Sequence, residues 1–467
     1  MKPKKSDSIY YTPPGAWLAD VMPFYAEGAF HLFHLHDLRE LPEQVPGGHW
    51  GPVSRHLVKT TDFVHFENHG EVLHNGSIRD QDLYVFTGSF VPDGHRYLFF
   101  YCGFNPHLVE QNRPAQTVMR AESRDLIHWK RLPDAPMGPT SDRYEMHDWR
   151  DPFVFWNQDA HEYWMILTAR LKEGPPPRRG CLLKLTSLDL QDWTDHGVFW
   201  WPGQYLNLEC PEVFKIGEWW YLIYSTYSER WVTHYRMSRS LDGPWLAPRN
   251  DTFDGRSFYA AKTASDGSKR FVIGWIPTRR DETDLGAWEW GGSLLAHEVV
   301  QQADGTLGVR PPEAVRARQN HLDGFGPHRL GRGAVVQDTA ARFEHVDGFS
   351  YVLGRELPMQ CRIEATMTFE AGTRGLGLIL RASDDLEAGY YARLEPHMQR
   401  LVLDILPRRG DYPFLPELER PVDLQPRTRH RLTVFVDGSI AVVYLDDTVA
   451  MTFRMYQRPD GRLGVFC

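Results

Sequence analysis

The feature that most constrains the fold is a pair of segments that recurs in constant order. The first member is a short aromatic run with five copies: "GAFHLFHL" from Gly28, "HRYLFFYCG" from His95, "HEYWMILTAR" from His161, "GEWWYLIYST" from Gly217 and "KRFVIGW" from Lys269. The second member is a polar turn leading to an aromatic residue, as in "TTDFVHF" and "SRDLIHW", and it follows the first four of these aromatic runs. Runs this apolar predict strands that are covered on both faces.

The spacing of these runs predicts a five-bladed β-propeller. Successive runs are on the order of 50 to 70 residues apart, which is enough for a four-stranded antiparallel blade and its loops. Aromatic residues make up 13% of the chain, and this excess also favours an all-β fold. The alternative is a stack of immunoglobulin-like sandwiches, but that architecture predicts linkers between repeats and does not explain the repeated polar turn.

The pattern changes after the fifth run, and this change predicts the domain organisation. We expect a propeller over residues 1–301, a polar and partly helical connector over 302–334, and a β-sandwich over 335–467. Alternating strands such as those in "RHRLTVFVDGSIAVVYLDD" support the sandwich, with Asp437 and Gly438 forming a hairpin turn.

Charge and cysteine usage exclude several classes of function. The formal net charge is -9 and no long basic run is present, which argues against nucleic acid as a partner. No apolar run approaches the length that spans a bilayer, and no signal-peptide core follows the N-terminus, so we expect a cytoplasmic protein without a membrane partner. The five cysteines are scattered without metal-ligand or redox spacing, which predicts neither disulfides nor a metal site.

Three acidic residues stand just before aromatic runs of different blades. They are Asp20 in "WLADVMPF", Asp151 in "WRDPFVFW" and Glu209 in "ECPEVF". Any one of them alone fits a capped turn or an ion pair with arginine. Because the inner strands of a propeller converge on an axial channel, their shared position relative to the following run favours one central site.

Glycoside cleavage supplies a chemical reason for this set of acids. It needs one carboxylate as nucleophile and a second carboxyl group, with a raised pKa, as proton donor. A third group can hold sugar hydroxyls. Arg150 directly precedes Asp151 and favours its ionised form, so Asp151 suits the holding role better than proton donation.

With these motifs the chain resembles glycoside hydrolase family 32, whose members join a five-bladed propeller to a β-sandwich and act on β-fructofuranosides. Further matches are "FTGS" from Phe86 and "FDGRSFYAAKT" followed by "VIGW". The resemblance implies that Asp20 is the nucleophile, Glu209 the general acid/base and Asp151 the transition-state stabiliser. It also implies a carbohydrate substrate, no cofactor, and a sugar pocket lined by Trp50, Phe86, Thr87, Arg150, Cys210 and Trp275.

The departures from the family pattern lie beside the proposed nucleophile. The family usually has Asn-Asp-Pro-Asn-Gly where this chain has "ADVMP", so Ala19 offers no amide to a sugar. Where a Gln-containing run is typical, the chain has "LHD", and we expect His36 to contact the substrate there. A metal site at His34 and His36 is the weaker alternative, since no further ligand follows at fixed spacing. The loss of polar ligands should change substrate choice more than reaction type.

The sequence therefore predicts a metal-independent, retaining enzyme that releases terminal β-linked fructose from sucrose or short fructans. One alternative is a fructosyltransferase, a difructose-anhydride-forming enzyme, or a glycosidase for another furanoside such as an arabinofuranoside. A second alternative is a sugar-binding propeller without catalysis. We expect the sandwich to be structural, with substrate binding or homo-oligomer formation as its alternative role.

Overall fold

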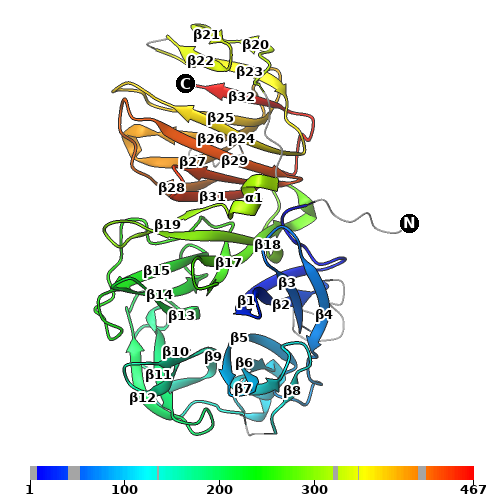
Figure 1. Cartoon of the computed structure of the whole chain (residues 1–467), viewed down its shortest axis with the longest axis vertical. Coiled ribbons are helices and arrows are strands. Elements are labelled where there is room, and N and C mark those ends of the chain that lie inside the picture. The colour runs from blue at the N-terminus through cyan, green and yellow to red at the C-terminus, as the bar shows by residue number, and fades with distance from the viewer. Residues whose placement is uncertain (1–7, 40–52, 134–135, 319–323, 345–346, 409–416) are drawn as a thin grey trace.

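The computed structural model describes residues 8–39, 53–133, 136–318, 324–344, 347–408 and 417–467. Nearly all of its elements are strands, and they form a ring of blades followed by two facing sheets (Figure 1). The predicted all-β architecture, a five-bladed β-propeller followed by a β-sandwich, is confirmed. Among the described residues, no helix has the length and apolar character needed to cross a membrane.

Each blade is built from strands that are consecutive in sequence and pair antiparallel. Blade I contains β1 (Trp17–Ala26), β2 (Ala29–Asp37), β3 (Ser54–Thr60) and β4 (Glu67–Leu73). Blade II contains β5 (Tyr84–Asp93), β6 (Arg96–Phe104), β7 (Gln116–Ser123) and β8 (Lys130–Arg131). Blade III contains β9 (Tyr144–Asn157), β10 (Glu162–Leu171), β11 (Gly180–Ser187) and β12 (Thr194–Trp200). The five aromatic runs of the sequence form the second strand of each blade.

The remaining two blades complete the ring, and blade IV has three named strands whereas blade V has four. Blade IV contains β13 (Glu209–Ile216), β14 (Trp219–Thr226) and β15 (Val232–Ser238), and a bridge between Met237 and Leu246 extends its outer edge. Blade V contains β16 (Tyr259–Ser265), β17 (Arg270–Arg279), β18 (Trp288–Gln301) and β19 (Leu307–Arg310). The ring closes where Leu18 of β1 pairs with Gly292 of β18.

The recurring polar turn is a hydrogen-bonded cap at the end of the third strand. At the end of β3, the Oγ1 of Thr60 accepts hydrogen bonds from the amides of Asp62 (3.2 Å) and Phe63 (2.8 Å). At the end of β11, Ser187 does the same for Asp189 (3.2 Å) and Leu190 (2.9 Å). The apolar residue of each turn is buried and has a positive φ, so the cap tucks a core side chain under the blade.

The C-terminal region consists of two sheets packed face to face, as in other β-sandwiches. One has the order β24 (Gln360–Met367), β29 (His430–Asp437), β30 (Ile440–Leu445) and β31 (Val449–Arg454). The other has the order β20 (Arg329–Leu330), β23 (Tyr351–Glu356), β32 (Arg462–Phe466), β25 (Leu376–Ala382), β26 (Gly389–Glu395), β27 (Arg400–Leu406) and β28 (Leu418–Pro421). Their facing apolar side chains form a separate core. The predicted hairpin is present, but Gly438 and Ser439 form its turn instead of Asp437 and Gly438, because Asp437 still pairs with Ile440.

Short elements complete the chain. They are η1 (Pro106–Gln111), η2 (Pro176–Arg178), η3 (Arg280–Glu282), α1 (Glu313–Arg318), η4 (Pro396–Met398) and the hairpin of β21 (Ala334–Gln337) and β22 (Ala340–Phe343). The predicted domain limits at residues 301 and 334 stay predictions. Around them, β19 pairs with β18 of blade V and β20 pairs with β23 of the sandwich.

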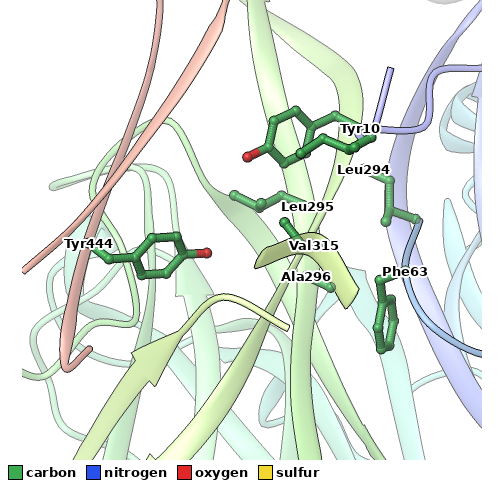
Figure 2. A pocket seen from close by; sticks show the side chains of 8 residues that line it. Tyr10, Phe63, Leu294, Leu295, Ala296, Val315 and Tyr444 are labelled. Atoms are coloured by element: carbon green, nitrogen blue, oxygen red, sulfur yellow. The ribbon is translucent and has the colours of Figure 1, made fainter. Parts of the chain in front are cut away.

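Buried polar contacts join the propeller to the sandwich. Asp254 of the loop before β16 accepts hydrogen bonds from the amide (2.9 Å) and hydroxyl (2.5 Å) of Thr452, and His297 contacts the Tyr444 hydroxyl at 2.7 Å. Beside them lies a cavity of about 10 Å³. Figure 2 shows the side chains that line it, which include Tyr10, Tyr444 and residues of β18 and α1. This space holds at most about one water molecule, so the junction is closely packed.

Candidate active site

The innermost strand of every blade has a one-residue bulge at the same place. On β1, Ala19 pairs with Leu35 and Met22 pairs with Phe33, so three steps on the inner strand oppose two on its neighbour. The same shift occurs at residues 85/88 of β5, 150/153 of β9, 209/212 of β13 and 259/262 of β16. Because a bulge bends the strand and re-aims a side chain, the fold presents five equivalent positions in the ring.

The residues that open these bulges are Asp20, Phe86, Asp151, Cys210 and Ala260. All except Phe86 have a positive φ, from 36° at Asp20 to 55° at Asp151. This backbone conformation is uncommon for residues other than glycine and costs on the order of 1–3 kcal/mol, and it is often found at functional sites. Two carboxylates therefore occupy equivalent strained positions in blades I and III.

Asp20 is held by side chains from other blades. The Oγ1 of Thr87 in blade II donates a hydrogen bond to its Oδ2 at 2.9 Å, and the Nε1 of Trp275 in blade V donates to its Oδ1 at 3.3 Å. Burial, together with the negative charge of Asp151, raises the pKa of Asp20 to about 6, although both hydrogen bonds act in the opposite direction. Thr87 and Trp275 therefore both contact Asp20, and their predicted role in lining a sugar pocket stays a prediction.

Asp151 is the most enclosed of the three acids, with 4% of its surface exposed. The backbone amide of Cys210 donates a hydrogen bond to its Oδ2 at 2.9 Å, and the Nε of Arg150 lies 3.7 Å from the same oxygen. Blade IV and the preceding arginine thereby fix this carboxylate. No described residue donates a hydrogen bond to its Oδ1, which leaves that oxygen available for a hydroxyl.

Glu209 is held between a cation and a phenol. Nη2 of Arg150 donates to its Oε1 at 3.2 Å, and the hydroxyl of Tyr259 donates to its Oε2 at 2.6 Å. Burial raises the pKa of Glu209 to about 7; Arg150 and Tyr259 oppose this rise, while the charges of Asp151 and Asp20 add to it. Near neutral pH this side chain is therefore divided between its acid and its carboxylate form.

The register corrects one expectation from the sequence. Glu209 pairs with Ser225 as Arg150 pairs with Thr168, so Glu209 lies one residue before the bulge position. Cys210, not Glu209, is the equivalent of Asp20 and Asp151. The expectation that all three acids share one position was wrong for Glu209, because the common mark of the register is the proline after the bulge residue in "RDP" and "ECP".

Aromatic contacts connect the two ends of this acidic group. The rings of Trp275 and Tyr259 meet edge to face with centroids 5.6 Å apart, and each is hydrogen-bonded to a different acid. The chain of contacts therefore runs from Asp20 through Trp275 and Tyr259 to Glu209. A second chain runs from Asp20 through Thr87 to the thiol of Cys210, which lies 3.9 Å from the Thr87 hydroxyl.

Sequence reasoning missed three residues of the site. Tyr259 was quoted only within a motif, although it contacts Glu209 directly. Arg55 is buried beneath the cluster, where it donates to the carbonyls of Val85 (3.0 Å) and Phe86 (2.7 Å), and burial lowers its pKa to about 9. Asp148 binds Arg150 at 2.7 Å.

The other predicted pocket residues have different outcomes. Phe86 lies at the bulge of blade II and stacks on Phe104 with centroids 5.3 Å apart. His36 stacks on His56 at 3.8 Å and lies on the opposite face of blade I from Arg55, since neighbouring strand residues alternate. Its proposed contact with substrate stays a prediction. Trp50 lies outside the described residues.

The arrangement suits acid/base and nucleophilic chemistry. Two carboxyl groups with pKa values of about 6 and about 7 belong to one connected group of side chains, which is the pattern expected of an ionised nucleophile beside a proton donor. Among the residues that the structure describes, no three His, Cys, Asp or Glu side chains are grouped so that they could hold a metal ion. The five cysteines are free.

Comparisons with known proteins agree with this geometry. The Glycosyl hydrolases family 32 N-terminal domain matches residues 10–309. Sucrose-6-phosphate hydrolase and raffinose invertase, both from Escherichia coli, are each 25% identical over 97% of this chain and 90% of their own length. The solved GH32 β-fructofuranosidase of Bombyx mori has a TM-score of 0.71 at 18% identity, and the match covers 98% of this chain and 90% of that chain.

The propeller, its connected group of three acids and these similarities define a glycosidase. The chain belongs to glycosyl hydrolase family 32, because the domain match covers more than half of its length.

Proposed function

We propose that the protein is a retaining β-fructofuranosidase that releases terminal fructose units from sucrose or short fructans. The observation that carries this proposal is that Asp20 of blade I and Glu209 of blade IV are linked through Trp275 and Tyr259, each of which donates a hydrogen bond to one of the two acids. The named activities of the relatives, sucrose-6-phosphate hydrolase, raffinose invertase and β-fructofuranosidase, support the substrate class.

In the first step, the ionised carboxylate of Asp20 attacks the anomeric carbon. The protonated Glu209 donates its proton to the leaving oxygen, and a covalent fructosyl-enzyme forms. In the second step, the Glu209 carboxylate takes a proton from water, which attacks the same carbon and releases Asp20. The lower pKa of Asp20 and the higher pKa of Glu209 favour this assignment over the reverse.

Asp151 has the holding role in this mechanism. Its Oδ2 is fixed by the Cys210 amide, so its Oδ1 can accept hydrogen bonds from sugar hydroxyls. Arg150 binds both Asp151 and Glu209, and it maintains the distance between the group that holds the sugar and the group that donates the proton. We further propose a cytoplasmic location, and that the enzyme acts without nucleic acid or membrane partners; homo-oligomer formation is part of the same proposal.

The test is product analysis by NMR with sucrose, sucrose 6-phosphate, inulin, levan and aryl furanosides. We expect free fructose that is initially the β-anomer, read before mutarotation. An initial α-anomer would exclude Asp20 as nucleophile. Absence of fructose from every fructoside, with binding retained, would favour a propeller that binds sugar without cleaving it.

One observation favours a second candidate within the same reaction class. Ala19 and Val21, which flank Asp20, are both fully buried and apolar, so neither offers a polar group to a fructose hydroxyl. A site that lacks such contacts loses selectivity for that sugar. An enzyme that cleaves another furanoside, or one that transfers fructose to a sugar, is consistent with these two apolar residues beside Asp20. Faster release from an aryl arabinofuranoside than from any fructoside would establish the former.

A further inference from the structure

A second cavity, of about 460 Å³, lies beyond the bulges on the same five inner strands. In every blade its lining begins just after the bulge, with Met22, Gly88, Phe153, Glu212 and Lys262 as the first residues. None of the three acids of the candidate active site lines it. The cavity is therefore a separate compartment of the axial channel, further along each inner strand, in the ring of blades shown in Figure 1.

Lys262 is the unusual residue of this cavity. It is only 3% exposed, and its Nζ donates one hydrogen bond, to the carbonyl of Pro211 at 3.0 Å. The structure gives it no salt bridge to any described carboxylate. A buried ammonium without a counter-ion is unfavourable, because neither water nor an opposite charge replaces its hydration.

The ammonium of Lys262 reaches across the channel. Its Nζ lies 5.2 Å from the ring centroid of Phe153, and both residues line the cavity. Phe153 belongs to blade III and Lys262 to blade V, which are not neighbours in the ring. The charge is therefore close to the axis, where a ligand that enters this end of the channel meets it.

The other charges of the cavity leave it net positive. Glu212 is occupied by neighbours, since it accepts hydrogen bonds from the amide (2.8 Å) and hydroxyl of Thr263 and lies 3.8 Å from Nη1 of Arg270. Arg270 uses the same Nη1 to donate to Thr263 at 2.6 Å. With Lys262 and Arg270 against Glu212, the lining carries a charge of +1 within a chain whose formal charge is -9.

The walls of the cavity are aromatic. Phe24, Phe155, Trp156 and Tyr163 belong to the lining, and Trp156 meets Tyr163 edge to face with centroids 4.8 Å apart. Trp156 is 43% exposed, which is a large exposed fraction for a tryptophan side chain that lines a cavity. The volume is in the range of about 300–1,000 Å³ that is typical of small-molecule sites, and such sites combine apolar walls with few polar groups.

We infer that this cavity binds a small organic anion, with its carboxylate or phosphate group against Lys262 and its body against the aromatic wall. Arg270 at the open side adds attraction for the anion. The shared chemistry is an oxyanion on a flat or apolar body, and the two sources, carboxylate and phosphate ester, are separated by experiment.

The test is isothermal titration calorimetry of the whole chain with benzoate, phenyl phosphate and the neutral benzamide. We expect one of the anions to bind one to one, at least about tenfold more tightly than benzamide. In Lys262→Met the affinity should fall about tenfold or more, because the charge is lost and the length is kept. Lys215→Met, on the exposed side of β13, is the matched control and should bind as the wild type does.

Two further variants keep the inference testable if Lys262→Met does not fold. Trp156→Leu removes the exposed wall and should weaken binding severalfold, and Arg270→Gln should have a smaller effect. Glu209→Gln should leave anion binding unchanged. This result would show that the anion binds in this cavity and not to Arg150 of the candidate active site. The inference is overturned if neither anion binds below about 10 mM, if benzamide binds equally well, or if the Lys262 and Trp156 variants both bind like the wild type. None of these readouts requires turnover, so their failure is distinct from failure of the proposed activity.

Discussion

The bulges of blades I and III and those of blades II and V share one backbone feature and differ in chemistry. Asp20 and Asp151 occupy the first pair, whereas Phe86 and Ala260 occupy the second. The fold supplies five equivalent positions around the channel, and the residue type decides which of them become acidic. In the mechanism proposed above, catalytic capacity therefore depends on the residue type at a few positions that the propeller provides in any case.

The acidic positions also differ from the apolar ones in their cost. Ala260 has nearly the same backbone strain as the two aspartates, with a φ of 48°, but it carries no charge. Asp20 has a pKa of about 6 because burial disfavours its ionised form. A carboxylate in this place lowers stability, and function is the reason to keep it.

The largest expected effect comes from Asp20→Asn, which gives blade I an uncharged bulge like those of blades II and V. The value of kcat on sucrose should fall by about 10⁴-fold or more, because the amide does not act as a nucleophile. Initial rates, with circular dichroism to verify folding, measure this loss. Asp93→Asn, at the far end of an inner strand, is the control and should stay close to wild type. A loss below tenfold would remove the distinction between the two kinds of bulge.

Glu209→Gln should reduce kcat on sucrose by about 10²–10⁴-fold, which is the usual range for a general acid. The reduction should be much smaller for an aryl fructoside with a good leaving group, because that leaving group needs no proton. The ratio of the two losses is the measurement. Glu218→Gln changes an exposed residue of the same blade and should alter neither rate. Equal losses for both substrates would contradict the role of proton donor.

Asp20→Asn should also increase stability at neutral pH. The folded pKa of about 6 exceeds the unfolded value of about 3.9, so the folded state binds the proton more tightly. The wild-type free energy of unfolding should therefore fall as pH rises from about 4 to about 6, by about 3 kcal/mol from this group. Urea denaturation should show the variant more stable at pH 7 and similar at pH 4. For Ala260→Gly, at an uncharged bulge, the difference in free energy of unfolding from the wild type should be the same at pH 4 and pH 7, because Asp20 is still present.

The smallest effect is expected for Tyr259→Phe. The tyrosine hydroxyl stabilises the charged form of Glu209, so its removal should raise the pKa of Glu209 above about 7. The basic limb of the kcat/KM profile should move to higher pH by less than about one unit, since one hydrogen bond contributes about 1 kcal/mol. Tyr235→Phe, in blade IV, is the control. A limb that moves to lower pH would contradict the assignment.

Much of the fold and the identity of the acids could be predicted from the sequence. The five aromatic runs became the second strands of five blades, and the hydroxyl-Asp turns became the caps of β3, β7 and β11. Asp20, Asp151 and Glu209 were found because each stands a short distance before an aromatic run of a different blade. Tyr259 and Arg55 were not found, since a tyrosine or an arginine in a strand has many structural explanations.

The sequence by itself determined the repeat, the all-β class and the set of acids, because strand periodicity and a buried carboxylate leave a local signal in the residue order. Only the tertiary structure decided that every inner strand bulges at one level and that Cys210 rather than Glu209 occupies the bulge of blade IV. It also decided that Lys262 is buried with no salt bridge to a carboxylate in the described part of the chain. These features depend on pairing between strands and on contacts across the ring, and residues that are far apart in the chain meet there only after the blades close.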